Sequence, residues 1–268
     1  MPICIDFLIT SVNDGYISPF TGGYVRGFFL NAVYGVSQDL ANKLHDKKGI
    51  KPYSIKPLRP IGKKMNVVKG GWKIEKKDEM TFSISFLQDG LEAIILDALL
   101  NTEKITFSNI KFNLEKITVK RESYKDLASK VLGPRIGLEF KTPTFFKDPK
   151  LRFPYLFPEP KKIVSNLIKI WNAFAPPELR MPSEKVIEWS ETAIETRSFE
   201  LKTREAIIEN VRIPGFKGRV EWIIIEGERG ILTYLSPLLL LSEFSNVGQK
   251  RTYGLGVVKI TDLTAINK

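Results

Sequence analysis

The sequence is poor in the residues that build disulfides and metal sites. It contains one cysteine, Cys4, and one histidine, His45, in 268 residues. A single cysteine cannot form an internal disulfide, and this pair leaves too few ligands for a zinc site of the usual types. No apolar run approaches the roughly 20 residues that a membrane-spanning helix needs. We therefore expect a soluble protein of the reducing cytoplasm that uses no metal or other cofactor and does not enter a membrane.

Acidic residues are almost missing from one part of the chain. Between Lys47 and Lys77 there are eleven basic residues and one acidic residue, Glu75, so this stretch carries +10 of the formal net charge of +11. One strongly positive region on an otherwise balanced chain favours a polyanionic partner such as RNA, DNA or an anionic membrane. A solvated lysine-rich loop of the kind found in heat-adapted proteins is the alternative.

The first half of the sequence predicts alternating strands and helices. Residues with period-two alternation predict strands, and apolar residues at helical spacing predict helices. The expected strands are 3–11, 52–59, 80–87 and 105–123, and the expected helices are 21–46, which Gly35 and Ser37 can divide, and 89–100. The order strand, helix, strand, strand, helix, strand is that of a ferredoxin-like unit, which we assign to residues 1–124.

The second half is less regular. Strands are expected at 136–146, 198–208, 218–227 and 253–263, and helices at 160–174, 183–195 and 236–245. The proline-rich segment 149–160 is expected to be an insertion or a lid and not a core element. This order is compatible with a second ferredoxin-like domain in residues 125–268, although the pattern alone does not establish it.

The most distinctive local motif is the run from Asn246 to Gly256. It places Gly248, Gly254 and Gly256 around Lys250 and Arg251, between an expected helix and an expected strand. Glycines let backbone amides approach a phosphate chain, and two cations neutralise phosphates without reading a base. The motif therefore predicts a loop that binds phosphodiesters. An ordinary glycine turn before an edge strand is the alternative.

His45 closes the first expected helix and precedes Lys51. A lone histidine at the end of a helix is often a surface residue that suits the helix dipole. A histidine with a nearby lysine can also cleave RNA without metal, because the chemistry needs proton transfer and a cation that stabilises the charged phosphorane. Nothing in the sequence resembles a serine hydrolase elbow or requires an acidic two-metal nuclease site.

Three segments, taken together, resemble a known family. They are GGYVRGFFLNAV, LHDKKGIK and SPLLLLSEFSNVGQKRTYGLGVVKI. In order and spacing they are similar to the CRISPR-associated endoribonucleases of the RAMP superfamily that process precursor CRISPR RNA. The resemblance implies an α+β protein of tandem ferredoxin-like (RRM-like) domains, with antiparallel sheets and helices on one face. It also implies a metal-independent cut in repeat RNA that leaves a 2′,3′-cyclic phosphate.

The resemblance also implies the site residues. His45 and Lys51 match the catalytic histidine and lysine, whereas the tyrosine that some members use falls on Leu30, so Tyr34, one turn away, is the candidate for that role. In the glycine-rich loop, Asn246 replaces the first glycine of the family pattern. The expected RNA-binding residues are Arg26, Lys47, Lys48, Lys56, Arg59, Gly248, Lys250, Arg251, Gly254 and Gly256.

Three functions remain open at this level. The first is an endoribonuclease that cleaves CRISPR repeat RNA in precursor transcripts, and the second is a non-catalytic repeat-RNA-binding relative or an RNA-holding subunit of a CRISPR ribonucleoprotein. A basic ferredoxin-like protein that binds other proteins or ribosomal RNA is the third. Subunits of a CRISPR effector complex and a second copy of the chain are further expected partners. The sequence does not define the repeat or the residues that read its bases.

Overall fold

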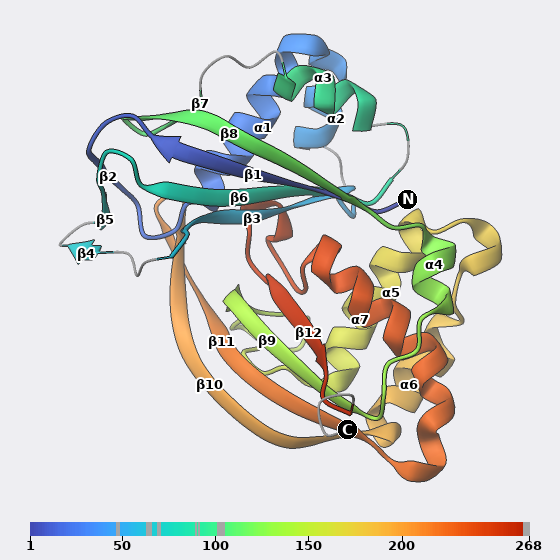
Figure 1. Cartoon of the computed structure of the whole chain (residues 1–268). Coiled ribbons are helices and arrows are strands. Elements are labelled where there is room, and N and C mark those ends of the chain that lie inside the picture. The colour runs from blue at the N-terminus through green and yellow to red at the C-terminus, as the bar shows by residue number, and fades with distance from the viewer. Residues whose placement is uncertain are drawn as a thin grey trace.

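The computed structural model describes two large antiparallel sheets and one small third sheet in a single chain (Figure 1). It describes residues 1–46, 49–62, 66–68, 71–88, 90, 92–100 and 105–264. In Figure 1 one sheet lies above the other, with α1, α2 and α3 over the upper sheet and α5, α6 and α7 beside the lower one.

The N-terminal unit has a sheet with the order β3-β6-β1-β8-β7. Its strands are β1 (Ile3–Ser11), β3 (Tyr53–Pro60), β6 (Glu79–Phe86), β7 (Ile105–Phe107) and β8 (Ile110–Arg121), and its helices are α1 (Gly22–Val36), α2 (Gln38–Asp46) and α3 (Glu92–Leu100). The central strand β1 pairs antiparallel with β6 and β8. The expected ferredoxin-like unit is thus confirmed, with β7 as an added edge strand.

Alternation along β1 decides which face of this sheet is covered. Ile5 and Phe7 point to the helices and are fully buried with Val25, Phe29 and Val33 of α1. The expected division of the first helix is also confirmed, because α1 ends at Val36 and α2 begins at Gln38.

A small separate sheet extends this unit. It consists of β2 (Gly15–Ile17), β4 (Asn66–Val68) and β5 (Gly71–Ile74), in the order β2-β5-β4. Its pairing Val68↔Gly71 closes a hairpin. Several lysines of the basic stretch, at positions 47, 48, 63, 64 and 69, lie outside the described residues.

The C-terminal unit repeats the topology with the order β10-β11-β9-β12. Its strands are β9 (Arg135–Thr144), β10 (Ile194–Ile208), β11 (Val211–Ile224) and β12 (Val258–Asp262), and its helices are α5 (Pro160–Phe174), α6 (Ser183–Ala193) and α7 (Leu232–Ser245), with 3-10 turns η1 (Pro177–Leu179), η2 (Glu226–Ile231) and η3 (Arg251–Tyr253). The predicted strand 253–263 was wrong at its start. Gly254 and Gly256 have φ values of 83° and 72°, which a strand cannot continue.

A short helix, α4 (Tyr124–Ser129), links the two units. Tyr124 and Leu127 belong to the hydrophobic core of the C-terminal unit, and the Tyr124 hydroxyl donates to the Leu87 carbonyl at 2.9 Å. Cys4 of β1 is buried against the same core. The proposed domain boundary between residues 124 and 125 thus falls at the start of a helix that packs with the second unit, and it stays a prediction.

Candidate functional site

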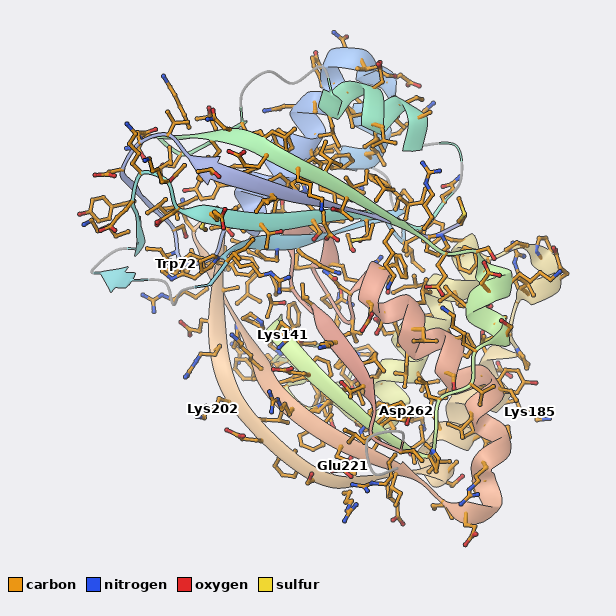
Figure 2. All side chains as sticks on the ribbon, viewed as in Figure 1. Trp72, Lys141, Lys185, Lys202, Glu221 and Asp262 are labelled. Carbon is orange, nitrogen blue, oxygen red and sulfur yellow. The ribbon has the colours of Figure 1, made fainter. Side chains whose placement is uncertain are left out.

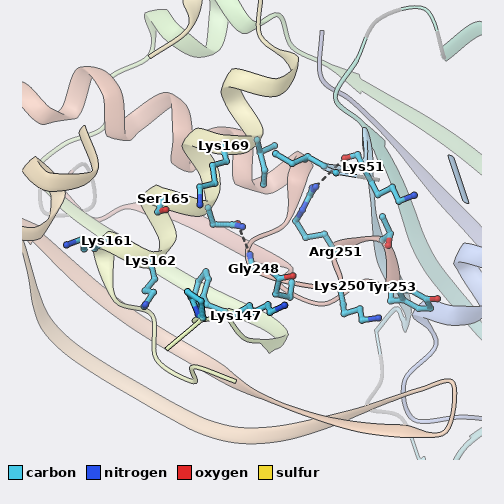
Figure 3. Close-up of a pocket in the computed structure, with 18 of the residues that line it drawn as sticks. Lys51, Lys147, Lys161, Lys162, Ser165, Lys169, Gly248, Lys250, Arg251 and Tyr253 are labelled. Atoms are coloured by element: carbon cyan, nitrogen blue, oxygen red, sulfur yellow. Dashed lines mark hydrogen bonds between the residues drawn. The ribbon is translucent and has the colours of Figure 1, made fainter. Parts of the chain in front are cut away.

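A cleft of about 710 Å³ lies where the two units meet (Figure 3). Its N-terminal wall comes from α1, α2 and the segment before β3, and its C-terminal wall comes from α5 and the glycine-rich loop. Its basic lining residues are Arg26, His45, Lys51, Lys147, Lys161, Lys162, Lys169, Lys250 and Arg251, and no described aspartate or glutamate lines it. A concave surface with charge of one sign concentrates polyanions.

His45 and Lys51 meet at the end of α2. The exposed His45 side chain lies in the last turn of that helix and lines the cleft. The Lys51 ammonium donates to the main-chain oxygens of Leu44 at 3.0 Å and His45 at 2.8 Å. These are carbonyls that the helix leaves without an intrahelical partner, so Lys51 caps α2 and fixes the backbone that carries His45.

The glycine-rich loop is packed tightly for internal reasons. A Cβ on Gly256 would lie 1.7 Å from the Val247 oxygen, and one on Gly254 would lie 2.6 Å from Cγ of Pro57. The Gly248 amide is already used, because it donates to Asn166 Oδ1 at 2.8 Å. The left-handed backbone and the contacts with neighbouring segments therefore explain why these positions need glycine. The sequence interpretation gave a different reason, close approach of the backbone to phosphate.

Asn246 holds the loop against the N-terminal unit. It has a φ of 56° and a ψ of 176°, a conformation outside the left-handed helical region that favours glycine, so hydrogen bonds of its side chain must hold it. Its Nδ2 donates to the Ile55 oxygen at 2.9 Å and to the Leu255 oxygen at 3.2 Å. The replacement of a family glycine by asparagine is thus accommodated, and it adds a bond between the units.

Arg251 corrects the sequence interpretation. It was expected to contact phosphate, but its side chain is buried and its guanidinium donates to the main-chain oxygens of Ser245 at 2.7 Å and Lys51 at 3.2 Å. Burial lowers the pKa of Arg251 to about 10, because desolvation disfavours the charged form. Arg251 therefore joins the loop to the segment that carries Lys51, and it is a structural residue of the cleft wall.

Two further basic side chains, Arg26 and Lys250, line the cleft beside Tyr253. The Arg26 guanidinium lies 4.7 Å from the centre of the Tyr253 ring, and the Lys250 ammonium lies 5.4 Å from the same ring. Tyr253 is anchored in turn by a hydrogen bond from its hydroxyl to the Glu209 carboxylate. Behind Arg26, burial raises the pKa of Tyr53, which keeps this phenol neutral. The cation–π contacts hold both cations beside the cleft.

Five described residues of the predicted site do not line the cleft, namely Tyr34, Lys56, Arg59, Gly254 and Gly256. Tyr34 is half exposed on α1, and Arg59 is exposed on β3. Lys56, also on β3, is partly buried with its ammonium 4.0 Å from the Cys4 sulfur. Leu30 packs against the N-terminal core. Of the expected residues, the cleft thus brings together Arg26, His45, Lys51, Gly248, Lys250 and Arg251. Lys47 and Lys48 lie outside the described residues.

Sequence reasoning missed the cations of the C-terminal wall. Lys161, Lys162 and Lys169 lie on α5, and Lys147 follows β9. The available signal was the helical spacing of polar residues in the segment 160–174, opposite an apolar face. Only folding brings this face to His45, more than 100 residues earlier in the chain.

Neither a metal cluster nor a membrane span was found in the part of the chain that the structure describes. No group of three or more His, Cys, Asp or Glu side chains within the described ranges could hold a metal ion. No described helix is long and apolar enough to cross a membrane.

Comparison with known proteins gives one family. Residues 138–258 match the family model of the CRISPR-associated endoribonuclease Cas6. Cas6 of Streptococcus thermophilus is 22% identical over 194 residues, which cover 70% of this chain and 78% of that protein. Cas6 of Mycobacterium tuberculosis is 26% identical over 135 residues, which cover 50% of this chain and 41% of that protein. The resemblance seen in the sequence is confirmed.

Solved structures give the same fold. A Cas6 (TTHA0078) product complex is 25% identical, with a TM-score of 0.72, and the alignment covers 97% of this chain and 100% of that chain. Thermus thermophilus Cas6 (TTHB231) is 24% identical, with a TM-score of 0.71, over 97% of this chain and 98% of that chain. These likenesses confirm the expected α+β fold of tandem ferredoxin-like units.

Proposed function

We propose that this chain, which is similar to the CRISPR-associated Cas6 endoribonucleases, cleaves CRISPR repeat RNA in precursor transcripts. The observation that carries the proposal is the position of His45 in a cleft between two ferredoxin-like units that is lined by cations and by no described carboxylate. Such a cleft attracts the phosphate backbone, and His45, the histidine among its described lining residues, is of the side-chain type most often used for proton transfer in catalysis.

The proposed reaction is a transesterification that needs no metal. The 2′-oxygen of the nucleotide before the cut loses its proton and attacks the adjacent phosphorus, while the bond to the 5′-oxygen of the next nucleotide breaks. The proton passes to a base, and the departing 5′-oxygen receives a proton from an acid. The products are a 2′,3′-cyclic phosphate and a 5′-hydroxyl, so atoms and charge balance without water.

Three residues supply this chemistry in our proposal. His45 transfers a proton at one of the two oxygens. Arg26 and Lys51 lie at the same end of the cleft and stabilise the additional negative charge on the phosphorane. Lys250, held over Tyr253, binds a neighbouring phosphate. Tyr34 has no role in our proposal because it does not line the cleft, and Arg251 has none because its guanidinium binds two main-chain carbonyls.

The decisive experiment compares wild-type protein with His45→Ala on a labelled cognate repeat under single-turnover conditions. We expect the cleavage rate to fall by about 10²–10⁴-fold, because general acid–base catalysis contributes that much, while the affinity for the repeat is unchanged. Lys43→Ala is the matched control, since Lys43 is an exposed residue of α2 that pairs with Asp39 and does not line the cleft. Equal cutting by the His45→Ala protein would disprove the assignment.

The product ends test the mechanism separately. We expect the 5′ fragment to resist phosphatase until acid opens its cyclic phosphate. A single 2′-deoxy substitution at the nucleotide before the cut should block cleavage and leave binding intact, because it removes the attacking oxygen. Cleavage of the 2′-deoxy substrate would rule out the proposed reaction.

One observation favours a second candidate function, a non-catalytic RNA-binding relative or an RNA-holding subunit of a CRISPR ribonucleoprotein. Leu30 stands where some relatives have a tyrosine, and Tyr34 lies outside the cleft. Such a protein would shift the repeat RNA in a gel without shortening it. Association with CRISPR effector subunits, formation of a homodimer and a cytoplasmic location belong to the same proposal. Size-exclusion chromatography with and without repeat RNA tests the homodimer.

A further inference from the structure

One face of α5 turns a row of polar side chains to the cleft. Ser165 and Asn166 each lie three or four positions from Lys162 and from Lys169, and all four residues line the cleft together with Lys161. Residues at this spacing lie one above another on a helix. The opposite face of α5 is buried in the C-terminal core. The row is therefore a continuous surface and not a chance group of lysines on a loop.

The charges on this surface are only partly balanced within the protein. Lys161 pairs with Glu191, and Lys162 pairs with Asp148. Lys169 and the neighbouring Lys147 are exposed and form no salt bridge with a described residue. Two cations thus face the cleft without an acidic partner among the described residues, so an anionic ligand gains attraction there with no internal ion pair to break.

The dimensions of the row suit a chain of phosphates. Lys162 and Lys169 are seven positions apart, which corresponds to about 10 Å along a helix. A stacked nucleic-acid strand advances by about 3.4 Å per nucleotide along its axis, so the row is longer than a single nucleotide step. A single small anion would contact only one end of the row.

The row is also held at a fixed position relative to the reaction site. Asn166 of α5 accepts the hydrogen bond from the Gly248 amide, and Arg251 of the same loop binds the Lys51 oxygen. Figure 3 shows Lys161 and Lys162 on one side of Gly248, and Lys51 and Lys250 on the other. Together these contacts link α5 through the loop to the end of the cleft that contains His45.

From this arrangement we infer that the cleft-facing row of α5, together with Lys147, is a phosphate-binding track for the RNA strand that flanks the cut. The inference rests on the proposed function, because it takes RNA as the ligand. The track binds the backbone through charge and does not read bases. It therefore sets how strongly and in which register the RNA is held, and it leaves the chemical step to the other end of the cleft.

The test measures binding of an uncleavable repeat, 2′-deoxy at the nucleotide before the cut, over a series of salt concentrations. For the Lys147→Ala/Lys169→Ala double variant we expect weaker binding, and a slope of log K against log salt that is smaller by about 0.7 for each lysine removed. Lys185→Ala is the control, because Lys185 is an exposed lysine of α6 that does not line the cleft and lies at the outer edge of the molecule in Figure 2.

The inference would be overturned if the double variant bound the repeat with the same affinity as wild type and with the same slope of log K against log salt. A second arm uses a dinucleotide that contains only the cut phosphate and therefore offers no flanking phosphate to the track. The double variant should bind this RNA as wild type does, and an equal loss with long and short RNA would also contradict the inference. Circular dichroism and thermal unfolding of each variant exclude misfolding as the cause of a loss.

The two proposals fail in different ways. If wild-type protein binds the repeat without cutting it, and the double variant loses affinity and slope, the track stands and the catalytic proposal does not. If wild type cuts through His45 but the double variant keeps full affinity and slope, the catalytic proposal stands and the track is wrong.

Discussion

The guanidinium of Arg251 donates a hydrogen bond to the main-chain oxygen of Lys51 at 3.2 Å, across 200 positions of the sequence. Lys51 in turn donates through its side chain to the carbonyl of His45. The glycine-rich loop of the C-terminal unit is thereby connected to the candidate catalytic histidine of the N-terminal unit by two successive hydrogen bonds. We infer that the loop holds the two walls of the cleft in fixed positions relative to each other.

A first prediction concerns the buried arginine. Arg251→Lys keeps the positive charge but cannot reproduce the two-pronged contact with both carbonyls. We expect the free energy of unfolding to fall by about 1–3 kcal/mol, because at least one of the two carbonyl groups loses its charged donor. Urea unfolding measures this, with Arg229→Ala, a change at an exposed residue of η2, as the control. Unchanged stability together with weaker RNA binding would restore the sequence interpretation, in which Arg251 contacts phosphate.

A second prediction compares two glycines. Gly256→Ala places a methyl group against the Val247 oxygen on a backbone with φ of 72°. The left-handed conformation alone costs about 1–2 kcal/mol, and the clash adds to it. Gly35→Ala, on a helix surface with open space around the new Cβ, should instead stabilise the protein by about 0.5–1 kcal/mol. Thermal unfolding measures the change in melting temperature of each variant. A melting temperature that is lowered only in Gly35→Ala would contradict the packing described for the loop.

A third prediction separates the two roles of Lys51. Lys51→Ala removes a cation from the cleft and the cap from α2, so we expect single-turnover cleavage to fall by about 10²-fold. Hydrogen exchange of the last amides of α2 should accelerate as the helix end frays. Lys51→Arg can retain both the charge and bonds to the carbonyls, so partial rescue of both properties is expected. Loss of cleavage with unchanged exchange would assign Lys51 to the RNA alone.

A fourth prediction concerns metals. The proposed reaction uses proton transfer and fixed cations, so EDTA should leave the rate of repeat cleavage unchanged. Manganese or magnesium should likewise fail to restore cleavage by His45→Ala. Rescue by either ion would point to a metal-dependent route, and inhibition by EDTA in wild type would have the same meaning.

The N-terminal fold could be predicted from local patterns because its helices and strands each carry a clear period. The alternation in β1 and β6 and the helical spacing of Val25, Phe29 and Val33 reflect burial on one face, which is a local property of the sequence. The segment 253–257 was misassigned because its apolar residues alternate as in a strand. The positive φ of two glycines, needed for contact with Pro57 and Val247, interrupts that strand.

The sequence by itself determined the order of elements, the excess of positive charge and the choice of His45 and Lys51, since these depend on residue type and short-range spacing. Only the tertiary structure decided which cations share a cleft with His45. In the structure Arg251 is buried and binds main-chain carbonyls in place of the expected phosphate. Tyr34, Lys56 and Arg59 do not line the cleft, whereas the α5 lysines do. The reason is physical: a side chain's exposure and partners depend on how two sheets and their helices pack, and residues more than 100 positions apart carry no local signal of that packing.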